Sequence, residues 1–158
     1  MSANKAPLRL RFLRLARMAA WLFATGCDLR KIDGDSPHER DEAIIKLGSG
    51  ALKALGIKLD VATPPEHFHV SGTLVVANHV SWIDIELVHS QRVVGFVAKS
   101  EISRWPLVGW LAGRAGTIYH QRGSNASLSS VLDRMVGRLD SGQAVGVFPE
   151  GGTSGGGT

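Results

Sequence analysis

The sequence predicts an α/β fold: a mixed, largely parallel sheet flanked by helices and preceded by an N-terminal pair of amphipathic helices. Short apolar runs typical of buried strands alternate along the chain with segments whose apolar residues return at helical spacing. Helical connections between such strands favour parallel pairing. The 158 residues, 44% of them hydrophobic, are enough for one domain with a core, and two domains are not expected.

A basic amphipathic segment opens the chain. Residues 7–23 predict a helix whose apolar and basic positions separate at about 100° per residue. The apolar positions are Leu8, Phe12, Leu15, Ala19, Leu22 and Phe23, and Arg11, Arg14 and Arg17 lie away from them. Residues 1–31 carry a net charge of +6, whereas the remainder carries −2. We therefore expect this helix to lie on an anionic membrane surface, with its arginines at the lipid phosphates.

Other interpretations of this segment stay open. Its uninterrupted apolar run, residues 18–27, is too short for a bilayer span, which takes about 20 residues. A signal peptide would also place basic residues before an apolar run, but arginines interrupt the pattern and no clear Ala-x-Ala cleavage site follows. An ordinary core helix with solvated arginines is the other alternative.

The second helix has clear ends in the sequence. Ser36 to Glu39 form a capping box with Pro37 at the first helical position, and Gly56 is a natural left-handed cap. Glycines in the middle of this helix predict close packing against another helix. Residues 57–61 then alternate like a strand, which Pro64-Pro65 would end.

The remaining elements alternate between strand and helix. Buried strands are expected at residues 73–77, 93–98, 117–120 and 144–148. A helix should follow the first strand, and residues 102–112 should be helical or irregular around Pro106. The final amphipathic helix, residues 125–139, is expected to turn five apolar side chains inward: Leu128, Val131, Leu132, Met135 and Leu139.

The first of these strands ends at Asn78-His79, and Asp84 falls in the first turn of the helix that follows. A neutral imidazole can take a proton from a hydroxyl if a carboxylate fixes its other ring nitrogen. No Gly-x-Ser-x-Gly pattern supplies a nucleophile, so the substrate's own hydroxyl is the expected one. The spacing alone leaves plain structural roles open, because Asn78 would also suit a turn and Ser81 a helix cap.

Residues 78–84, Asn-His-Val-Ser-Trp-Ile-Asp, resemble the Asn-His-x-Ser-x-x-Asp signature of the glycerolipid acyltransferases, the group that includes 1-acylglycerol-3-phosphate acyltransferase. Further blocks resemble the family in order and spacing. They are Lys99-Ser100-Glu101 with Pro106 and Gly109, residues 116–123, and residues 147–151. The resemblance covers residues 74–151.

The resemblance implies transfer of a fatty acyl group to the free hydroxyl of lysophosphatidic acid, giving phosphatidic acid without an acyl-enzyme. Acyl-CoA or acyl carrier protein would be the co-substrate, and no cofactor is implied. The implied place is the cytoplasmic face of the inner membrane, as a peripheral or monotopic protein. Another lysolipid acceptor, such as lyso-ornithine lipid, fits the same blocks.

By the same resemblance, His79 is the general base and Asp84 orients it, while four residues bind substrate: Lys99, Arg122, Glu150 and Gly151. A guanidinium at Arg122 would grip two phosphate oxygens at once. On composition alone, Arg122 and Lys99 would equally be solvated surface residues. The acyl chain needs an apolar groove, for which the candidates are Trp82, Trp105, Leu107, Trp110 and Leu111, although such residues usually belong to the core.

The expected organisation is a membrane-interface helix at 1–31, an incomplete acyltransferase domain at 32–151, and a flexible glycine-rich tail at 152–158. The family commonly continues Thr-Arg-Ser after the last block and then runs well beyond it, whereas Gly152-Thr153-Ser154 stand here. We therefore expect a truncated chain, and an inactive lipid-binding remnant is the alternative from another functional class.

Other classes of site find little support in the sequence. The single Cys27 excludes an intrachain disulfide, and no residues have zinc-ligand spacing. Nucleic-acid binding is not expected, because the basic excess lies in one apolar-striped helix. Four histidines are interpreted as surface or loop residues: His38, His67, His69 and His89.

Overall fold

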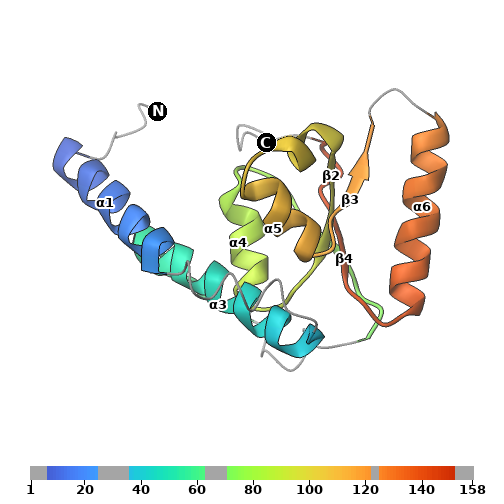
Figure 1. The fold of residues 1–158 in the computed structure, drawn as a ribbon, viewed down its shortest axis with the longest axis horizontal. Helices are drawn as coiled ribbons and strands as arrows, with labels where there is room; N and C mark the ends of the chain where they lie inside the picture. Colours follow the sequence, from blue (N-terminus) through green and yellow to red (C-terminus); the bar gives the residue numbers. More distant parts are fainter. Residues whose placement is uncertain (1–6, 25–35, 63–70, 122–124, 152–158) are drawn as a thin grey trace.

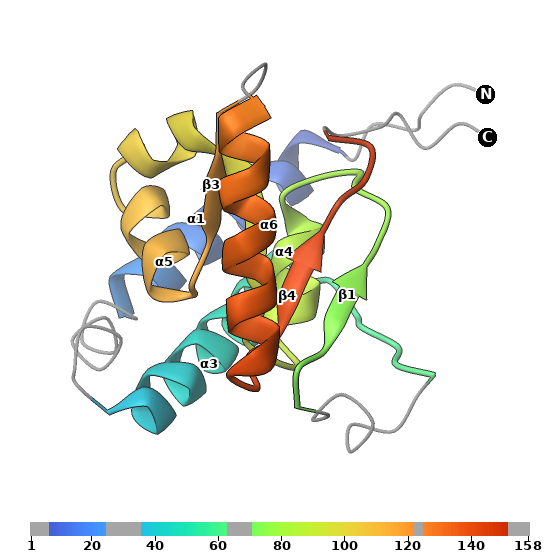
Figure 2. The ribbon, with the colours of Figure 1, turned by 90° about the vertical axis from the view of Figure 1, so that its right-hand side faces the viewer.

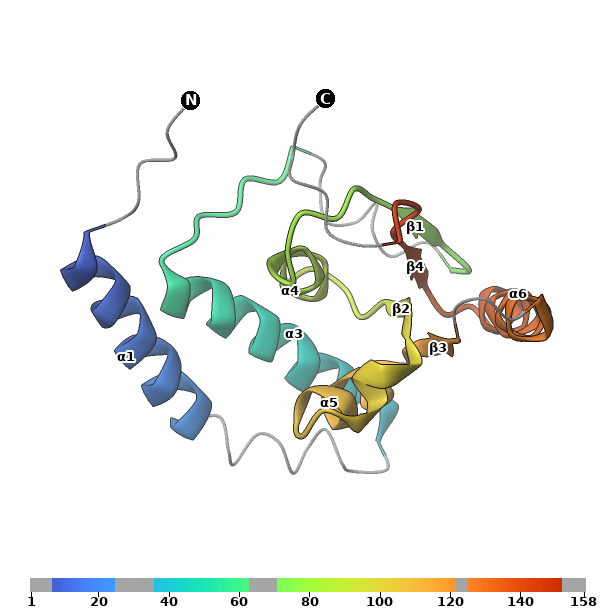
Figure 3. The ribbon, with the colours of Figure 1, turned by 90° about the horizontal axis from the view of Figure 1, so that it is seen from above.

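A computed structural model describes residues 7–24, 36–62, 71–121 and 125–151 of the chain. Its elements form layers, which Figure 1 shows from the side and Figure 3 from above. In the view from above, α1, α3 and α4 lie in succession on one side of a parallel sheet, and α6 lies on the other side. The predicted α/β class and the N-terminal helical pair are confirmed.

The helical pair consists of α1, Leu8–Ala24, and α3, Pro37–Leu55. The capping prediction for α3 is correct: the Ser36 side chain accepts a hydrogen bond from the backbone N–H of Glu39 at 3.4 Å. Gly56 ends the helix in the left-handed region, with φ of 70°. A residue with a Cβ atom is strained in that region, which is why glycine suits the position.

One side of α1 packs on α3, and the part of its predicted apolar stripe whose side chains the structure describes faces away. Arg17 donates a hydrogen bond from Nη2 to the backbone carbonyl of Lys53 at 3.0 Å, in the last turn of α3. Trp21 packs against the buried cluster around Ile44 and Leu47. The stripe residues Leu8, Phe12 and Leu15 are exposed.

The sheet has four parallel strands in the order β1-β4-β2-β3. They are β1, Leu74–Val76; β2, Gly95–Lys99; β3, Ile118–His120; and β4, Val145–Val147. Because the strands are parallel, all their carboxyl ends meet at one rim, where ligands of open α/β sheets commonly bind.

Helices cover the two faces of this sheet unequally. One face carries α4, Ile83–His89, the 3₁₀ helix η3, Ser100–Arg104, and α5, Val108–Arg114. The other carries α6, Asn125–Asp140. Val94, Phe96 and Ala144 form the core on the α4 side, and Ile118, Val131 and Val145 form the core on the α6 side.

The glycines in the middle of α3 allow the predicted close approach. A Cβ atom at Gly48 would lie 3.0 Å from the backbone nitrogen of Ser90 and 3.1 Å from the carbonyl oxygen of Glu86. A Cβ atom at Gly50 would collide with the ring of Trp21. Small residues at these positions therefore let α3 contact α4 on one side and α1 on the other.

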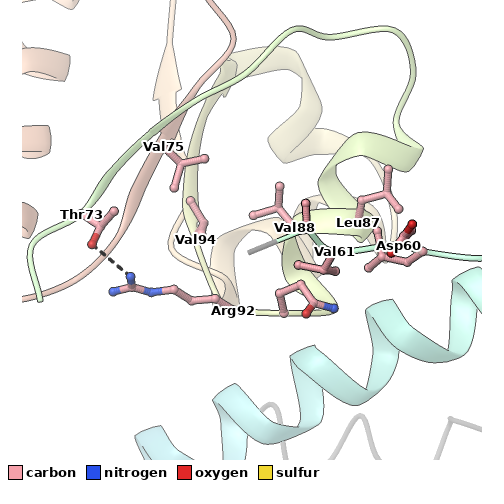
Figure 4. A pocket seen from close by; sticks show the side chains of 11 residues that line it. Asp60, Val61, Thr73, Val75, Leu87, Val88, Arg92 and Val94 are labelled. Carbon is pink, nitrogen blue, oxygen red and sulfur yellow. Dashed lines mark hydrogen bonds between the residues drawn. The ribbon is translucent and has the colours of Figure 1, made fainter. Parts of the chain in front are cut away.

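The strand predicted at residues 57–61 is wrong. This segment has no strand assignment and follows the edge of the fold after Gly56. Its side chains are used differently: Leu59 and Val61 help to line a pocket of about 360 Å³ beside Val75 and Val88 (Figure 4). The alternating apolar residues of this segment line a pocket with one side of the chain, and the backbone of the segment is not paired in the sheet.

Two burial predictions are also wrong. Strand β1 is buried on one face only: Val75 packs against the core around Phe96, whereas Leu74 and Val76 are exposed. Leu128 and Leu132 of α6 do not point inward. The reason is the position of α6, which lies level with β2 and β3 in Figure 3 and leaves β1 uncovered on that side. Of the five residues predicted to face inward on α6, Val131, Met135 and Leu139 do so.

His89 is a further correction. It is buried at the end of α4, and its Nε2 donates to the backbone carbonyl of Val94 at 3.0 Å. His38 is exposed as predicted, while His67 and His69 lie outside the described residues.

Within the described ranges, no helix has both the length and the apolar character that a bilayer span requires.

Candidate active site

A short turn at the carboxyl end of β1 carries the predicted His-Asp pair. The backbone N–H of Ala77 makes a last bond to the carbonyl of Val147 at 3.3 Å, after which the chain leaves the sheet. Helix α4 begins at Ile83, so Asp84 lies in its first turn. The turn and the first helical turn together return Asp84 towards His79, as the five-residue spacing requires.

His79 and Asp84 are in contact. The ring atom Nδ1 of His79 lies 3.2 Å from Oδ2 of Asp84. Both side chains are mostly covered, with 16% and 23% of their surfaces exposed. When Nδ1 carries the proton and donates it to the carboxylate, Nε2 is the basic nitrogen of the ring.

The carboxylate of Asp84 is itself held by the backbone of the turn. Its Oδ2 accepts hydrogen bonds from the N–H groups of Val80 at 2.7 Å and Ser81 at 2.8 Å. The hydroxyl of Ser81 accepts one from the N–H of Ile83 at 3.2 Å, so Ser81 also supports the start of α4. These hydrogen bonds hold the Asp84 carboxylate in place before any proton moves. Proton transfer at His79 would therefore require less reorganisation of the carboxylate.

A stack of aromatic rings fixes the other side of the histidine. The ring of Phe148 lies 4.2 Å from that of His79, centroid to centroid, at an interplanar angle of 19°. Phe96 stacks on the far face of this pair, 4.9 Å from Phe148. Neither phenylalanine was predicted to be a site residue. The available signal was the place of Phe148 in the last block that resembles the family, directly before Pro149.

The predicted substrate-binding residues Glu150 and Gly151 lie in a turn that follows Phe148. The N–H of Gly151 donates to the carbonyl of Phe148 at 3.0 Å, and Gly151 has φ of 64°. Pro149 occupies the second position of this turn, where its fixed φ is favourable. The exposed Glu150 is thus on the same rim as His79. It lies two residues after Phe148, whose ring stacks on the ring of His79.

Lys99 and Arg122 are not brought into contact with this pair. Lys99 ends β2 and is exposed, and its neighbour across the ladder is His120. Val97 belongs to the core on the α6 side, so alternation along the strand directs Lys99 to that side, whereas His79 stacks on the α4 side. Arg122 lies outside the described residues.

Two apolar side chains of the turn are exposed to solvent. Val80 and Trp82 lie within the turn that carries His79, and both are exposed. Trp105 and Leu107, which follow η3, are exposed as well. Trp110 and Leu111 instead pack against the buried cluster of α3. Three of the five residues proposed for an acyl groove are therefore at the surface.

In the described parts of the chain, no group of three or more His, Cys, Asp or Glu residues has an arrangement suited to a metal ion.

Two titratable groups on α4 lie behind the site. Burial raises the pKa of Glu86 and favours its protonated form. Burial lowers the pKa of His89, and its hydrogen bond to the Val94 carbonyl only partly opposes that effect. Neither group is in the His79–Asp84 pair, so both bear on the stability of α4.

Comparisons with known proteins agree with this arrangement. The family model described as Acyltransferase matches residues 61–158. A 1-acyl-sn-glycerol-3-phosphate acyltransferase of Neisseria meningitidis serogroup B is 45% identical over 99% of this chain, and that of Neisseria gonorrhoeae is equally similar. A lyso-ornithine lipid O-acyltransferase of Pseudomonas aeruginosa is 45% identical over 52% of this chain and 32% of its own length.

Among solved structures, the fold is similar to a 1-acyl-sn-glycerophosphate acyltransferase from Thermotoga maritima. The TM-score is 0.72 at 26% identity, covering 93% of this chain and 63% of that one. The chain spans 61% of the length of each Neisseria relative. With the family model matching more than half of its residues, this chain belongs to the glycerolipid acyltransferase family.

Proposed function

We propose that this protein transfers a fatty acyl group from acyl-CoA or acyl carrier protein to the free hydroxyl of lysophosphatidic acid, forming phosphatidic acid. The observation that carries the proposal is the contact of His79 Nδ1 with the Asp84 carboxylate at the sheet rim. The names of the Neisseria and Thermotoga relatives support the choice of acceptor.

In the proposed reaction, Nε2 of His79 takes the proton from the acceptor hydroxyl as its oxygen attacks the thioester carbonyl. Asp84 stabilises the imidazolium that forms and keeps Nδ1 protonated. When the tetrahedral intermediate collapses, the carbon–sulfur bond breaks and the imidazolium proton passes to the leaving thiolate. Because the nucleophile is the substrate's hydroxyl, no residue of the chain needs to be acylated.

Substrate binding is assigned to the same rim. Arg122 binds the phosphate of the acceptor. Lys99, exposed at the end of β2 and directed to the α6 side, adds positive charge to the rim from a distance. Glu150 accepts a hydrogen bond from the glycerol part, and Gly151 permits the turn that presents it. The exposed Val80 and Trp82 beside His79 offer apolar contacts to acyl chains.

A membrane surface is the proposed partner of α1, at the cytoplasmic face of the inner membrane. The outward stripe of Leu8, Phe12 and Leu15 would enter the interface, while the neighbouring arginines meet anionic headgroups. The opposite side of α1 is held to α3 by Arg17 and Trp21, so the stripe can be buried in lipid without disturbing the fold.

Lyso-ornithine lipid is the second candidate acceptor. Relatives named lyso-ornithine lipid O-acyltransferases from several bacteria match 52–61% of this chain at 35–45% identity. The acceptors differ in chemistry, because one carries a phosphate and the other an amino-acid headgroup. Direct comparison of the two lysolipids in one assay decides between them.

The test is an assay with labelled acyl-CoA or acyl carrier protein and each lysolipid in anionic vesicles. His79→Ala should reduce product by about 10²- to 10⁴-fold, the usual contribution of a general base. His38→Ala is the matched control, since that histidine is exposed on α3 and pairs with Glu42. Turnover that survives His79→Ala would refute the mechanism, and vesicle binding without any turnover would favour the lipid-binding remnant.

A further inference from the structure

The connection between η3 and α5 exposes a group of apolar side chains. It consists of residues 105–108, Trp-Pro-Leu-Val, which we call the η3–α5 turn. Trp105, Leu107 and Val108 are 57%, 44% and 47% exposed. Single exposed apolar residues are ordinary on protein surfaces, whereas a tryptophan and two aliphatic residues together in one short turn indicate a site of contact.

The backbone of this turn is strained. The N–H of Val108 donates to the carbonyl of Pro106 at 2.6 Å, which closes a three-residue γ-turn centred on Leu107. Leu107 has φ of 60° and ψ of −54°, the conformation of the rarer of the two γ-turn forms. Among the described residues, it is the one residue other than glycine with a positive φ. Strain of this kind is concentrated at functional positions.

Hydrogen bonds and close packing hold the turn in this conformation. The N–H of Trp105 donates to the carbonyl of Ile102 at 3.0 Å, and the N–H of Gly109 donates to the carbonyl of Trp105 at 2.8 Å. The hydroxyl of Tyr119 donates to the carbonyl of Gly109 at 3.1 Å. Gly109 is buried, and a Cβ atom there would collide with the carbonyl oxygen of Ser103. The exposed side chains are therefore presented by a well-supported backbone.

The turn lies at the same rim of the sheet as the His-Asp pair. Helix η3 begins directly after the last residue of β2, and α5 then returns along the sheet to the start of β3. In Figure 2, the strand arrows point upward and η3, in yellow, is at the upper end of the molecule. His79 follows β1 at this rim and stacks on the α4 side, which α5 also covers.

Helix α1 begins at this end of the molecule as well. Figure 2 is turned about the vertical axis of Figure 1, and in both views the start of α1 is level with η3. The first residues of the apolar stripe of α1, Leu8 and Phe12, are 83% and 75% exposed. A flat surface over this end can therefore meet the start of α1 and the η3–α5 turn together.

Basic side chains accompany both apolar patches. Residues 99–105 carry Lys99 and Arg104 against Glu101, a net charge of +1, and all three are exposed. Helix α1 has four arginines and no acidic residue. Tryptophan is enriched at the level of lipid headgroups, and basic side chains are attracted to anionic lipids. The combination fits the surface of an anionic bilayer.

We propose that the η3–α5 turn is a second membrane contact, at which Trp105, Leu107 and Val108 enter the headgroup region of an anionic bilayer. This contact rests on the proposed membrane binding of α1 and adds an orientation to it. With the bilayer held at both places, the rim that carries His79 faces the lipid. The strained γ-turn serves to present Leu107 at its tip.

The experiment places an environment-sensitive fluorophore at single thiols of the full chain, in a Cys27→Ser background. Val108→Cys reports on the turn, and Phe12→Cys reports on α1. Leu74→Cys is the matched control, because Leu74 and Val108 are both 47% exposed and Leu74 lies at the amino end of β1, away from the rim. Each protein is mixed with vesicles of phosphatidylglycerol and phosphatidylcholine, with and without spin-labelled lipid as a quencher. Neither lysolipid nor acyl donor is present.

The vesicles should shift the emission at positions 108 and 12 to shorter wavelength, and the spin-labelled lipid should quench both, while position 74 responds to neither. A response at position 12 without one at position 108 would overturn the second contact and leave the binding of α1 in place. Equal responses at positions 108 and 74 would also overturn it. Because His79-dependent turnover is measured in a separate assay, failure of the contact and failure of the catalytic proposal are distinguishable.

A second pair of variants tests the strained backbone. Leu107→Gly removes the apolar side chain and relieves the strain, because glycine readily adopts a positive φ. Its affinity for vesicles should fall by about fivefold, while its melting temperature in solution is no lower than that of the wild type. Leu132→Ala removes an exposed leucine from α6 and should leave the affinity unchanged. Unchanged affinity of Leu107→Gly, or a loss accompanied by a lower melting temperature, would overturn the proposal.

Discussion

The ring of His79 lies nearly parallel to the ring of Phe148, with 4.2 Å between centroids. The two residues follow β1 and β4, which are neighbours in the sheet although they are far apart in the sequence. The order of the strands thus brings the first and last blocks of the family signature together. Asp84 fixes one ring nitrogen, and Phe148 fixes the plane of the ring.

Phe148→Leu should weaken this second constraint without removing an ionisable group. Leucine fills much of the same volume but cannot stack, so the imidazole gains freedom about its side-chain torsions. We expect kcat to fall by about tenfold with little change in KM, because a positioning contact is lost rather than a substrate contact. Steady-state kinetics measure both, and an unchanged kcat would show that the stack does not position the ring.

Asp84→Asn should lower kcat by about 10²- to 10⁴-fold while the fold is retained. The amide oxygen can still accept the N–H groups of Val80 and Ser81, but a neutral amide stabilises the imidazolium poorly. Product formation and circular dichroism are measured together. A matched change at an exposed carboxylate, Glu42→Gln on α3, should leave turnover unaltered.

Glu86→Gln should stabilise the protein at neutral pH. Burial raises the folded pKa of Glu86 above its ordinary value of 4.5, so the native state binds this proton more tightly than the unfolded state. Its contribution to stability is complete below pH 4.5 and is lost as the pH rises through the folded pKa. Urea unfolding should therefore show a gain for the variant at pH 7 that disappears near pH 4. A gain that is the same at both values would contradict the burial argument.

His89→Gln should remove a source of acid instability. Burial lowers the folded pKa of His89 below 6.5, so its contribution to stability is present above pH 6.5 and is lost as the pH falls through the folded value. Glutamine keeps an N–H donor for the Val94 carbonyl and does not take up a proton in this range. The free energy of unfolding should then depend less on pH between 7 and 5 than in the wild type, as measured by urea titration at each pH.

Two glycine substitutions in helices should have opposite effects on stability. Gly48→Ala places a Cβ atom 3.0 Å from backbone of α4 and should cost about 1–3 kcal/mol through overpacking. Gly137→Ala on α6 meets nothing within 4 Å and should gain about 0.5–1 kcal/mol from helix propensity. Thermal unfolding of both variants checks the pair, and stabilisation by Gly48→Ala would show that α3 and α4 are not in close contact.

The parts of the fold that depend on neighbouring residues were predictable from the sequence. The cap at Ser36, the end at Gly56 and the meeting of His79 with Asp84 all lie within a few residues, so local spacing determines them. The alternation of strands and helices likewise predicted a parallel sheet. The local features are confirmed because few tertiary contacts specify them, and the parallel pairing is confirmed because helical segments connect each strand to the next.

The errors arise where the order of the strands decides the outcome. Apolar residues at Leu74 and Leu132 predicted burial, but whether a helix covers them depends on where α6 lies across the sheet. The stack of His79 on Phe148 required β1 and β4 to be neighbours, which no local pattern reveals. His89 was assigned to the surface because its partner is a backbone carbonyl, which the sequence does not mark.

The contact of α1 with α3 has a consequence for how lipid would reach the rim. Arg17 and Trp21 attach α1 to α3. Gly48 allows α3 to pack closely against α4, and Asp84 lies in the first turn of α4. An unbroken series of helix contacts therefore links the outermost helix to the carboxylate. If α1 binds a bilayer, this series of contacts would fix the height and orientation of His79 relative to the lipid headgroups. That height determines how far the hydroxyl of an acceptor lipid must move out of the bilayer to reach the ring.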